Sequence, residues 1–160
     1  MSFRTVALTA LLALSSPALA HDFSAGAIKV GHPWSRPTPA AAPVASGYVT
    51  LENTGKSADR LISATSPIAS KVEFHRSVVE DGIAKMRPLE NVVVEAGAKV
   101  DFEADRLHLM FMEPAQQLKD GDRFPATLVF EKAGSVSVEF VVQRKPAKAP
   151  EADHTGHVMK

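Results

Sequence analysis

The sequence predicts an all-β protein, a β-sandwich or β-barrel built from short strands. Apolar and polar residues alternate with a period of two in several segments, for example in residues 136–140, and this pattern indicates a strand with one buried face. Turn-forming Gly, Asn, Asp and Pro residues recur between these segments, which is typical of sandwiches and barrels. No window of useful length keeps an apolar period of 3.6 residues, so we expect helices to be minor.

The first half of the chain predicts four strands. They cover residues 27–30, 48–52, 59–64 and 72–75. The segment from Arg36 to Ala45 contains three prolines and several alanines without alternation, so we expect an irregular loop there. Trp34 is the only tryptophan and is expected to be a buried anchor.

The second half predicts six more strands. They cover residues 83–86, 92–94, 100–102, 107–112, 126–130 and 136–140. The sequence Glu80-Asp81-Gly82 predicts a tight hairpin turn between the strands that flank it. Gly97, Gly121 and Gly134 mark further turns.

The two ends of the chain differ in composition from the part between them. Residues 1–20 have a short basic start that contains Arg4, then a brief apolar run, and then small residues at the end. This pattern is typical of a secretory signal peptide, here with cleavage after Ala20. The apolar run is too short to span a bilayer, so we expect a soluble mature protein in the periplasm. Residues 144–160 contain too few large apolar side chains for their burial to offset the entropy cost of ordering the chain. We therefore expect them to form a flexible tail. A single domain at residues 21–143 lies between them.

Charge and cysteine content exclude several classes of function. Removal of residues 1–20 takes away Arg4 and no acidic residue, which leaves 17 basic and 18 acidic side chains and a net charge of −1. A nearly neutral protein offers no basic field for nucleic acid and no polybasic membrane patch. The chain has no cysteine, so it contains neither a disulfide framework nor a cysteine-ligated blue-copper site.

Four side chains stand out as candidate metal ligands: His75, Met86, His108 and Met110. Ten residues separate His75 from Met86, twenty-one separate Met86 from His108, and one leucine separates His108 from Met110. Two imidazoles and two thioethers suit Cu(I) better than magnesium, calcium or manganese, which prefer oxygen ligands. Zinc accepts imidazole, but its sites are usually completed by cysteine, histidine or carboxylate. Taken singly, however, a strand histidine is usually a surface group and a methionine is usually core filler.

The alternation of side chains predicts that these donors share one face of a sheet. In residues 107–112, the two leucines and Phe111 would face the core, whereas His108, Met110 and Met112 would line the opposite face. The same alternation in residues 72–75 turns Val72 and Phe74 inward and His75 outward, and Met86 follows in a third strand.

The spacing His-x10-Met-x21-His-x-Met resembles the signature of the PCu(A)C-type periplasmic copper chaperones at all four positions. The similarity extends over about residues 26–143 and includes the motifs His32-Pro33-Trp34, Asn53-Thr54-Gly55, Lys85-Met86-Arg87-Pro88, His108-Leu109-Met110 and Leu118-Lys119-Asp120-Gly121-Asp122. The resemblance implies a Greek-key β-barrel with a cupredoxin-like fold.

The resemblance also implies a binding protein and not an enzyme. Such a protein would hold copper as Cu(I) with His75, Met86, His108 and Met110 and would deliver it for assembly of the copper site of cytochrome c oxidase. The implied partners are the copper-receiving subunit of that oxidase and thiol-bearing assembly factors.

Two other classes of function remain open from the residues. A periplasmic copper storage or detoxification protein without a dedicated recipient would need the same site. A copper or zinc enzyme would need an open metal position and a general base. Glu73 lies near His75 on the same expected face, but one carboxylate in that position is commonplace on a strand.

The chain ends predict a secondary Cu(II) site. Cleavage after Ala20 would give His21 an α-amino nitrogen beside its imidazole, and His154, His157 and Met159 lie within six residues of the tail. Nitrogen-rich sites favour Cu(II), whereas a thioether-rich site favours Cu(I). The alternative is that His21 merely follows the cleavage site and that the tail is a solvated extension.

Overall fold

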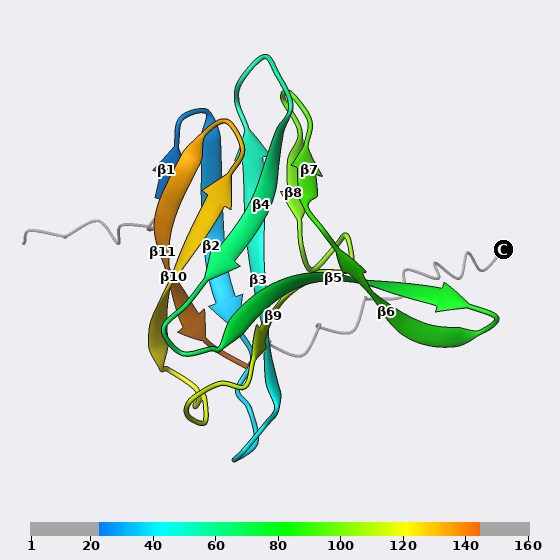
Figure 1. The fold of residues 1–160 in the computed structure, drawn as a ribbon, viewed down its shortest axis with the longest axis vertical. Coiled ribbons are helices and arrows are strands. Elements are labelled where there is room, and N and C mark those ends of the chain that lie inside the picture. Colours follow the sequence, from blue (N-terminus) through cyan, green and yellow to red (C-terminus); the bar gives the residue numbers. More distant parts are fainter. Residues whose placement is uncertain (1–22, 145–160) are drawn as a thin grey trace, which may run out of the picture.

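The computed structural model describes residues 23–144, and these residues form eleven strands and no helix (Figure 1). The all-β class predicted from the alternation is therefore confirmed. The strands are β1 (Phe23–Ala25), β2 (Ile28–Ser35), β3 (Val44–Asn53), β4 (Asp59–Thr65), β5 (Lys71–Glu80), β6 (Ile83–Leu89), β7 (Val92–Val94), β8 (Lys99–Asp101), β9 (Leu107–Met112), β10 (Arg123–Phe130) and β11 (Gly134–Val142).

All eleven strands belong to one sheet that curls back on itself. Its order is β6-β5-β9-β3-β2-β11-β10-β4-β7, while β1 pairs with β2 and β8 pairs with β3. The pairing of β11 with β2 is parallel and the other pairings are antiparallel. The Asn53 side chain on β3 donates to the Val94 carbonyl on β7 at 3.0 Å, so β7 at one end of the strand order reaches the middle of the sheet. This contact ties β7 to β3 across the curled sheet.

The interior of the barrel holds a compact group of phenylalanines. The ring centroid of Phe111 lies 5.2 Å from that of Phe124 and 5.3 Å from that of Phe140, in edge-to-face arrangements that aromatic pairs prefer. Gly47 on β3 makes room for them, because a Cβ atom there would lie 2.5 Å from the Phe111 ring. Trp34 is 5% exposed, as its anchor role predicts.

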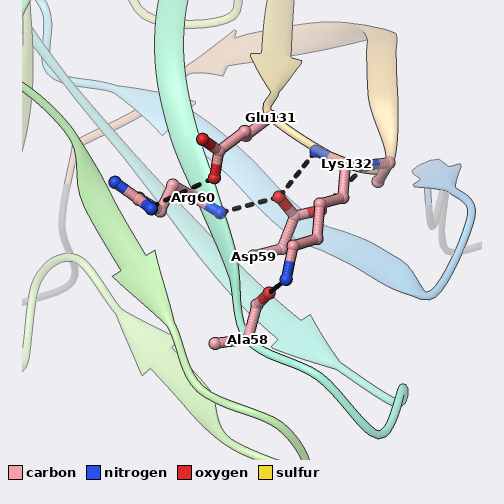
Figure 2. Close-up of polar contacts among 6 residues, drawn as sticks. Ala58, Asp59, Arg60, Glu131 and Lys132 are labelled. Atoms are coloured by element: carbon pink, nitrogen blue, oxygen red, sulfur yellow. Dashed lines mark hydrogen bonds and ion pairs between the residues drawn. The ribbon is translucent and has the colours of Figure 1, made fainter.

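A buried carboxylate fastens the β10–β11 turn to the start of β4 (Figure 2). One oxygen of Asp59 accepts from the backbone N–H of Arg60 at 2.7 Å and of Lys132 at 2.9 Å, and the other accepts from the N–H of Ala133 at 2.9 Å. Burial raises the pKa of Asp59, but these three donors and the Lys132 charge hold it below its ordinary value of 3.8.

Three local predictions need correction. The chain is already a strand at Val44 and Ala45, because β9 continues far enough to pair with both residues, whereas the expected loop extended to Ala45. Strand β1 was missed, because Phe23 is its only large apolar residue and no alternation is visible. The strand predicted at residues 27–30 continues to Ser35, and within it His32 has a φ of 47° at an irregularity in the pairing of β2 with β3.

The hairpin of β5 and β6 projects from the barrel, as Figure 1 shows. Its turn contains Asp81 with a φ of 53° and Gly82 with a φ of 76°, and two successive positive φ values match the hairpin turn predicted there. Val79 and Ile83 near the tip are exposed. The hairpin therefore carries its side chains into solvent beyond the end of β9.

Residues 1–22 and 145–160 lie outside the described part of the chain, so the predicted domain limits after residues 20 and 143 stay predictions. In residues 23–144 there is no helix long and apolar enough to cross a membrane.

We expect Asp59→Asn to lower the free energy of unfolding by about 1–3 kcal/mol, because an amide keeps only one acceptor oxygen for three part-buried backbone donors. A carboxylate whose folded pKa is lowered stabilises the fold above its unfolded pKa, and this contribution is lost as the pH falls through the folded value. The difference in unfolding free energy between wild type and variant should therefore become smaller below about pH 4. Denaturant unfolding at several pH values measures this.

Asp81→Asn is the matched control, because Asp81 lies exposed in a hairpin turn whose backbone asparagine also adopts. Equal stability of the Asp59→Asn variant and wild type near neutral pH would contradict the role assigned to the buried carboxylate.

Candidate functional site

Two of the predicted ligands face each other on neighbouring strands. In the antiparallel pairing of β5 with β9, His75 lies directly opposite His108, and Glu73 lies directly opposite Met110. Directly opposed residues project their side chains to the same face of a sheet, with Cβ atoms about 4.5–5.5 Å apart. We call this face, which carries His75, His108 and Met110, the donor face.

The opposite face of the same strands forms the core. Phe74 on β5 and the three apolar residues Leu107, Leu109 and Phe111 on β9 are all buried. The alternation predicted for residues 107–112 is therefore present, and the core packing of these residues fixes which face the histidines occupy.

Met86 lies on the donor face of the projecting hairpin. It is opposite Ser77 on β5, which is the next position on the same face after His75. Met86 is 53% exposed. Met86 is therefore a diagonal neighbour of His75 across the β5–β6 pairing, and it lies on β6, the strand at one edge of the sheet. The two histidines, in contrast, lie directly opposite each other.

Met110 is enclosed, in contrast to Met86. It is only 8% exposed, although it points away from the barrel core. Its neighbour on β3 is Ser46, whose hydroxyl donates to the Met110 Sδ at 3.8 Å. Met112, two residues further along β9, is half-buried and lies opposite Lys71.

Each histidine has a buried nitrogen without a hydrogen-bond partner among the described residues. These atoms are His75 Nδ1 and His108 Nδ1. A buried polar atom without a partner is costly unless a ligand completes it. The other nitrogen of His75, Nε2, lies 2.9 Å from an oxygen of Glu73.

His108 lies against an aromatic stack. Its ring and that of Tyr48 form a T-shaped pair at a centroid distance of 5.6 Å, and Tyr48 stacks on Trp34 at 4.6 Å. The Arg36 guanidinium lies 5.5 Å from the Tyr48 ring centre. Burial lowers the pKa of His108, and the Arg36 charge and His75 lower it further. These effects favour the neutral form of His108, which keeps a free lone pair on its ring.

Glu73 is held from both sides. Lys71 Nζ lies 2.7 Å from one of its oxygens, and His75 Nε2 contacts the other. The Lys71 hydrogen bond, followed by the His75 hydrogen bond, lowers the pKa of Glu73. This carboxylate stays charged, and both oxygens already have partners.

The donor face offers nitrogen and sulfur in place of a carboxylate cluster. Within residues 23–144, no three side chains of the His, Cys, Asp and Glu types are grouped to hold a metal ion. Two imidazoles with neighbouring thioethers are a borderline-to-soft set that favours a monovalent ion such as Cu(I).

The predicted secondary donors His21, His154, His157 and Met159 all lie outside the described residues. Their role stays a prediction.

Several residues around the site were not singled out from the sequence. Lys71 was missed, whereas Glu73 was already noted beside His75; the period of two in a strand is a signal that places all three on one face. Ser46 and Arg36 gave no such signal, because their approach to Met110 and to the Tyr48 ring depends on the pairing of β3 with distant strands.

A separate hollow of about 530 Å³ is lined by residues of β1, β2, β3, β8, β10 and β11 and contains none of the four predicted ligands. Its charged lining includes Arg123 and Glu139, which pair with each other at 2.6 Å. The donor face is thus distinct from this concave surface.

Comparisons with known proteins point to one family. The family model of the LpqE-like lipoproteins matches residues 28–142. Protein RP573 of Rickettsia prowazekii (strain Madrid E) is 28% identical over 109 residues, and the match covers 66% of this chain and 60% of that protein. The chain thus spans about 60% of the length of this curated relative.

Solved structures share the fold. The copper-bound PCuAC domain from PmoF2 is similar with a TM-score of 0.67 and 26% identity, covering 78% of this chain and 99% of that domain. The solution structure of apo-DR1885 from Deinococcus radiodurans is similar with a TM-score of 0.58 and 21% identity, covering 91% and 97% of the two chains. The latter likeness supports the cupredoxin-like fold class.

Proposed function

The chain belongs to the LpqE-like family, and from this premise we propose that it is a copper chaperone of the PCuAC type, a binding protein and not an enzyme. One observation carries the proposal. His75 lies directly opposite His108 on the face that also holds Met110, and both histidines have a buried Nδ1 without a partner. The copper-bound PmoF2 domain, similar over 78% of this chain, supports copper as the cargo.

The proposed ligands are His75, Met86, His108 and Met110, and the proposed oxidation state is Cu(I). Thioethers are soft and uncharged, so they favour the monovalent ion and need no deprotonation before binding. His108 also needs none at neutral pH, because its pKa is lowered by burial. A neutral donor set binds a single positive charge without burying any further charge.

The exposure of the two methionines differs in a way that suits transfer. Met110 is 8% exposed and Met86 is 53% exposed. An incoming ligand can therefore replace Met86 first, while the histidines and Met110 still hold the ion. A chaperone needs this order of exchange, because copper must leave without passing through water.

The proposed location is the periplasm, after removal of residues 1–20. The proposed recipient is the copper-receiving subunit of cytochrome c oxidase, with thiol-bearing assembly factors as further partners. This recipient rests on the resemblance of the His-x10-Met-x21-His-x-Met spacing to the PCu(A)C-type chaperones.

We further propose that the tail donors His154, His157 and Met159, with His21, form the secondary Cu(II) site. Histidine nitrogen binds Cu(II) well. The first residue of the tail is attached to the domain, because the Arg144 N–H donates to Asp120 at 3.0 Å.

Met110→Leu should weaken Cu(I) binding while leaving the copper-free fold intact, because leucine keeps the volume and removes only the sulfur. We expect at least a tenfold loss of affinity and a change in unfolding free energy below about 1.5 kcal/mol. Anaerobic titration against a competing Cu(I) chelator measures the first quantity, and denaturant unfolding of the copper-free protein measures the second.

Met112→Leu is the matched control, since Met112 is on the same face of β9 but beside Lys71 and away from the histidine pair. Equal affinities for Met110→Leu and wild type would remove Met110 from the site. Equal losses in both variants would mean that the sulfur ligand is misassigned.

Deletion of the gene should reduce cytochrome c oxidase activity in cells grown with limiting copper, because oxidase assembly would lack its copper source. Wild-type protein should restore the activity, and the Met110→Leu variant should not. The measurement is oxidase activity and copper content of isolated membranes. Normal oxidase activity combined with increased sensitivity to copper would favour storage or detoxification over delivery.

Truncation after Arg144 should reduce the Cu(II) stoichiometry of the mature protein and change its electron paramagnetic resonance spectrum. Ending the chain there keeps the Arg144 contact with Asp120, so the domain is unaltered. Cu(I) affinity at the main site should stay unchanged. The same stoichiometry and spectrum in both forms would exclude the tail, and a His21→Ala change would then test the N-terminus.

A further inference from the structure

The donor face contains a chain of polar contacts that ends on a proposed copper ligand. Lys71, Glu73 and His75 occupy alternate positions of β5 and therefore share one face. Lys71 Nζ lies 2.7 Å from Glu73 Oε1, and His75 Nε2 lies 2.9 Å from Glu73 Oε2. Each carboxylate oxygen has one partner.

The direction of the second contact follows from the chemistry of its two groups. A charged carboxylate only accepts hydrogen bonds, so His75 Nε2 must be the donor. A neutral imidazole carries one proton, and with that proton on Nε2 the lone pair is on Nδ1. This Nδ1 atom is buried and has no hydrogen-bond partner among the described residues.

We propose that Glu73, anchored by Lys71, is a positioning residue that holds His75 in the tautomer protonated on Nε2 and so reserves Nδ1 as the nitrogen that binds the metal. The inference rests on the proposed Cu(I) site and adds to it which nitrogen binds and what orients the ring. A carboxylate that receives the second N–H of a ligating histidine fixes both ring orientation and tautomer.

Lys71 gives the carboxylate a further property. Glu73 lies directly opposite Met110, so its oxygens are close to the soft donor set. Oxygen ligands suit hard ions and compete poorly for Cu(I). Because Lys71 and His75 engage both oxygens, Glu73 orients a ligand without becoming one.

The first experiment uses nuclear magnetic resonance of the ¹⁵N-labelled, copper-free protein at a pH where the imidazoles are neutral. Long-range ¹H–¹⁵N correlations distinguish Nε2–H from Nδ1–H for each histidine. We expect the Nε2–H form of His75 to predominate in wild type and in Glu73→Gln, because a glutamine oxygen still accepts. Glu73→Ala should shift His75 towards a mixture of tautomers.

The second experiment adds Cu(I), which is diamagnetic and so leaves the spectrum observable. Loading should shift the ¹⁵N resonance of His75 Nδ1 and leave its Nε2–H in place. Cu(I) affinity, measured by chelator competition, should fall about tenfold to a hundredfold in Glu73→Ala and less in Glu73→Gln.

Glu80→Ala is the matched control. Glu80 lies on the same strand with a similar exposure and pairs with Lys85 at 3.0 Å, but it projects from the opposite face of the hairpin. Its loss should alter neither the His75 tautomer nor the affinity. An affinity loss in Glu80→Ala equal to that in Glu73→Ala would attribute the effect to the hairpin fold and overturn the proposal.

The outcomes separate this inference from the proposed function. A wild-type His75 protonated mainly on Nδ1, or an unchanged tautomer and affinity in Glu73→Ala, overturns the positioning role whether or not copper binds. A wild-type protein that binds no Cu(I) under chelator competition overturns the proposed function together with the metal-binding part of this inference, even if the tautomer is the expected one.

Discussion

The site depends on the register between β5 and β9, which sets His75 opposite His108. A slip of one residue would turn every side chain of one strand to the other face and bury a histidine in the core. Such a slip is costly here, because Phe74 on β5 and Leu109 on β9 are buried and lie opposite each other. The buried apolar residues of β5 and β9 therefore fix the face on which the histidines lie.

That register is itself held by the rest of the barrel. Strand β9 lies between β5 and β3, and the close approach of β3 depends on Gly47, where any side chain would collide with Phe111. Two buried polar side chains fasten the strands at the other end of the sheet. Asn53 donates a hydrogen bond to β7, and Asp59 accepts hydrogen bonds from the β10–β11 turn. These contacts hold β5 and β9 in the register that sets the proposed ligands His75 and His108 opposite each other.

The period of two was enough to predict the fold class, most strands and the faces of β5 and β9, because alternation is a local property of the sequence. Contacts that require distant strands were not predictable in the same way. The enclosure of Met110 by Ser46 is such a contact, and so is the position of Arg36 over Tyr48. Exposure of Met86 also depends on how far the hairpin projects beyond the barrel, which no local pattern encodes.

The two halves of the donor face have different surroundings, and this difference links the fold to the proposed transfer of copper. His108 and Met110 lie on β9, which is covered on both sides by neighbouring strands, whereas Met86 lies on the sheet's outermost strand. His75 is between them, 17% exposed and tied to Glu73. Ligands on a covered strand keep a fixed geometry, and a ligand on an edge strand is open to replacement. If the proposed ligands bind copper, this difference in cover would let the site hold the ion from β9 and release it at Met86 on the hairpin.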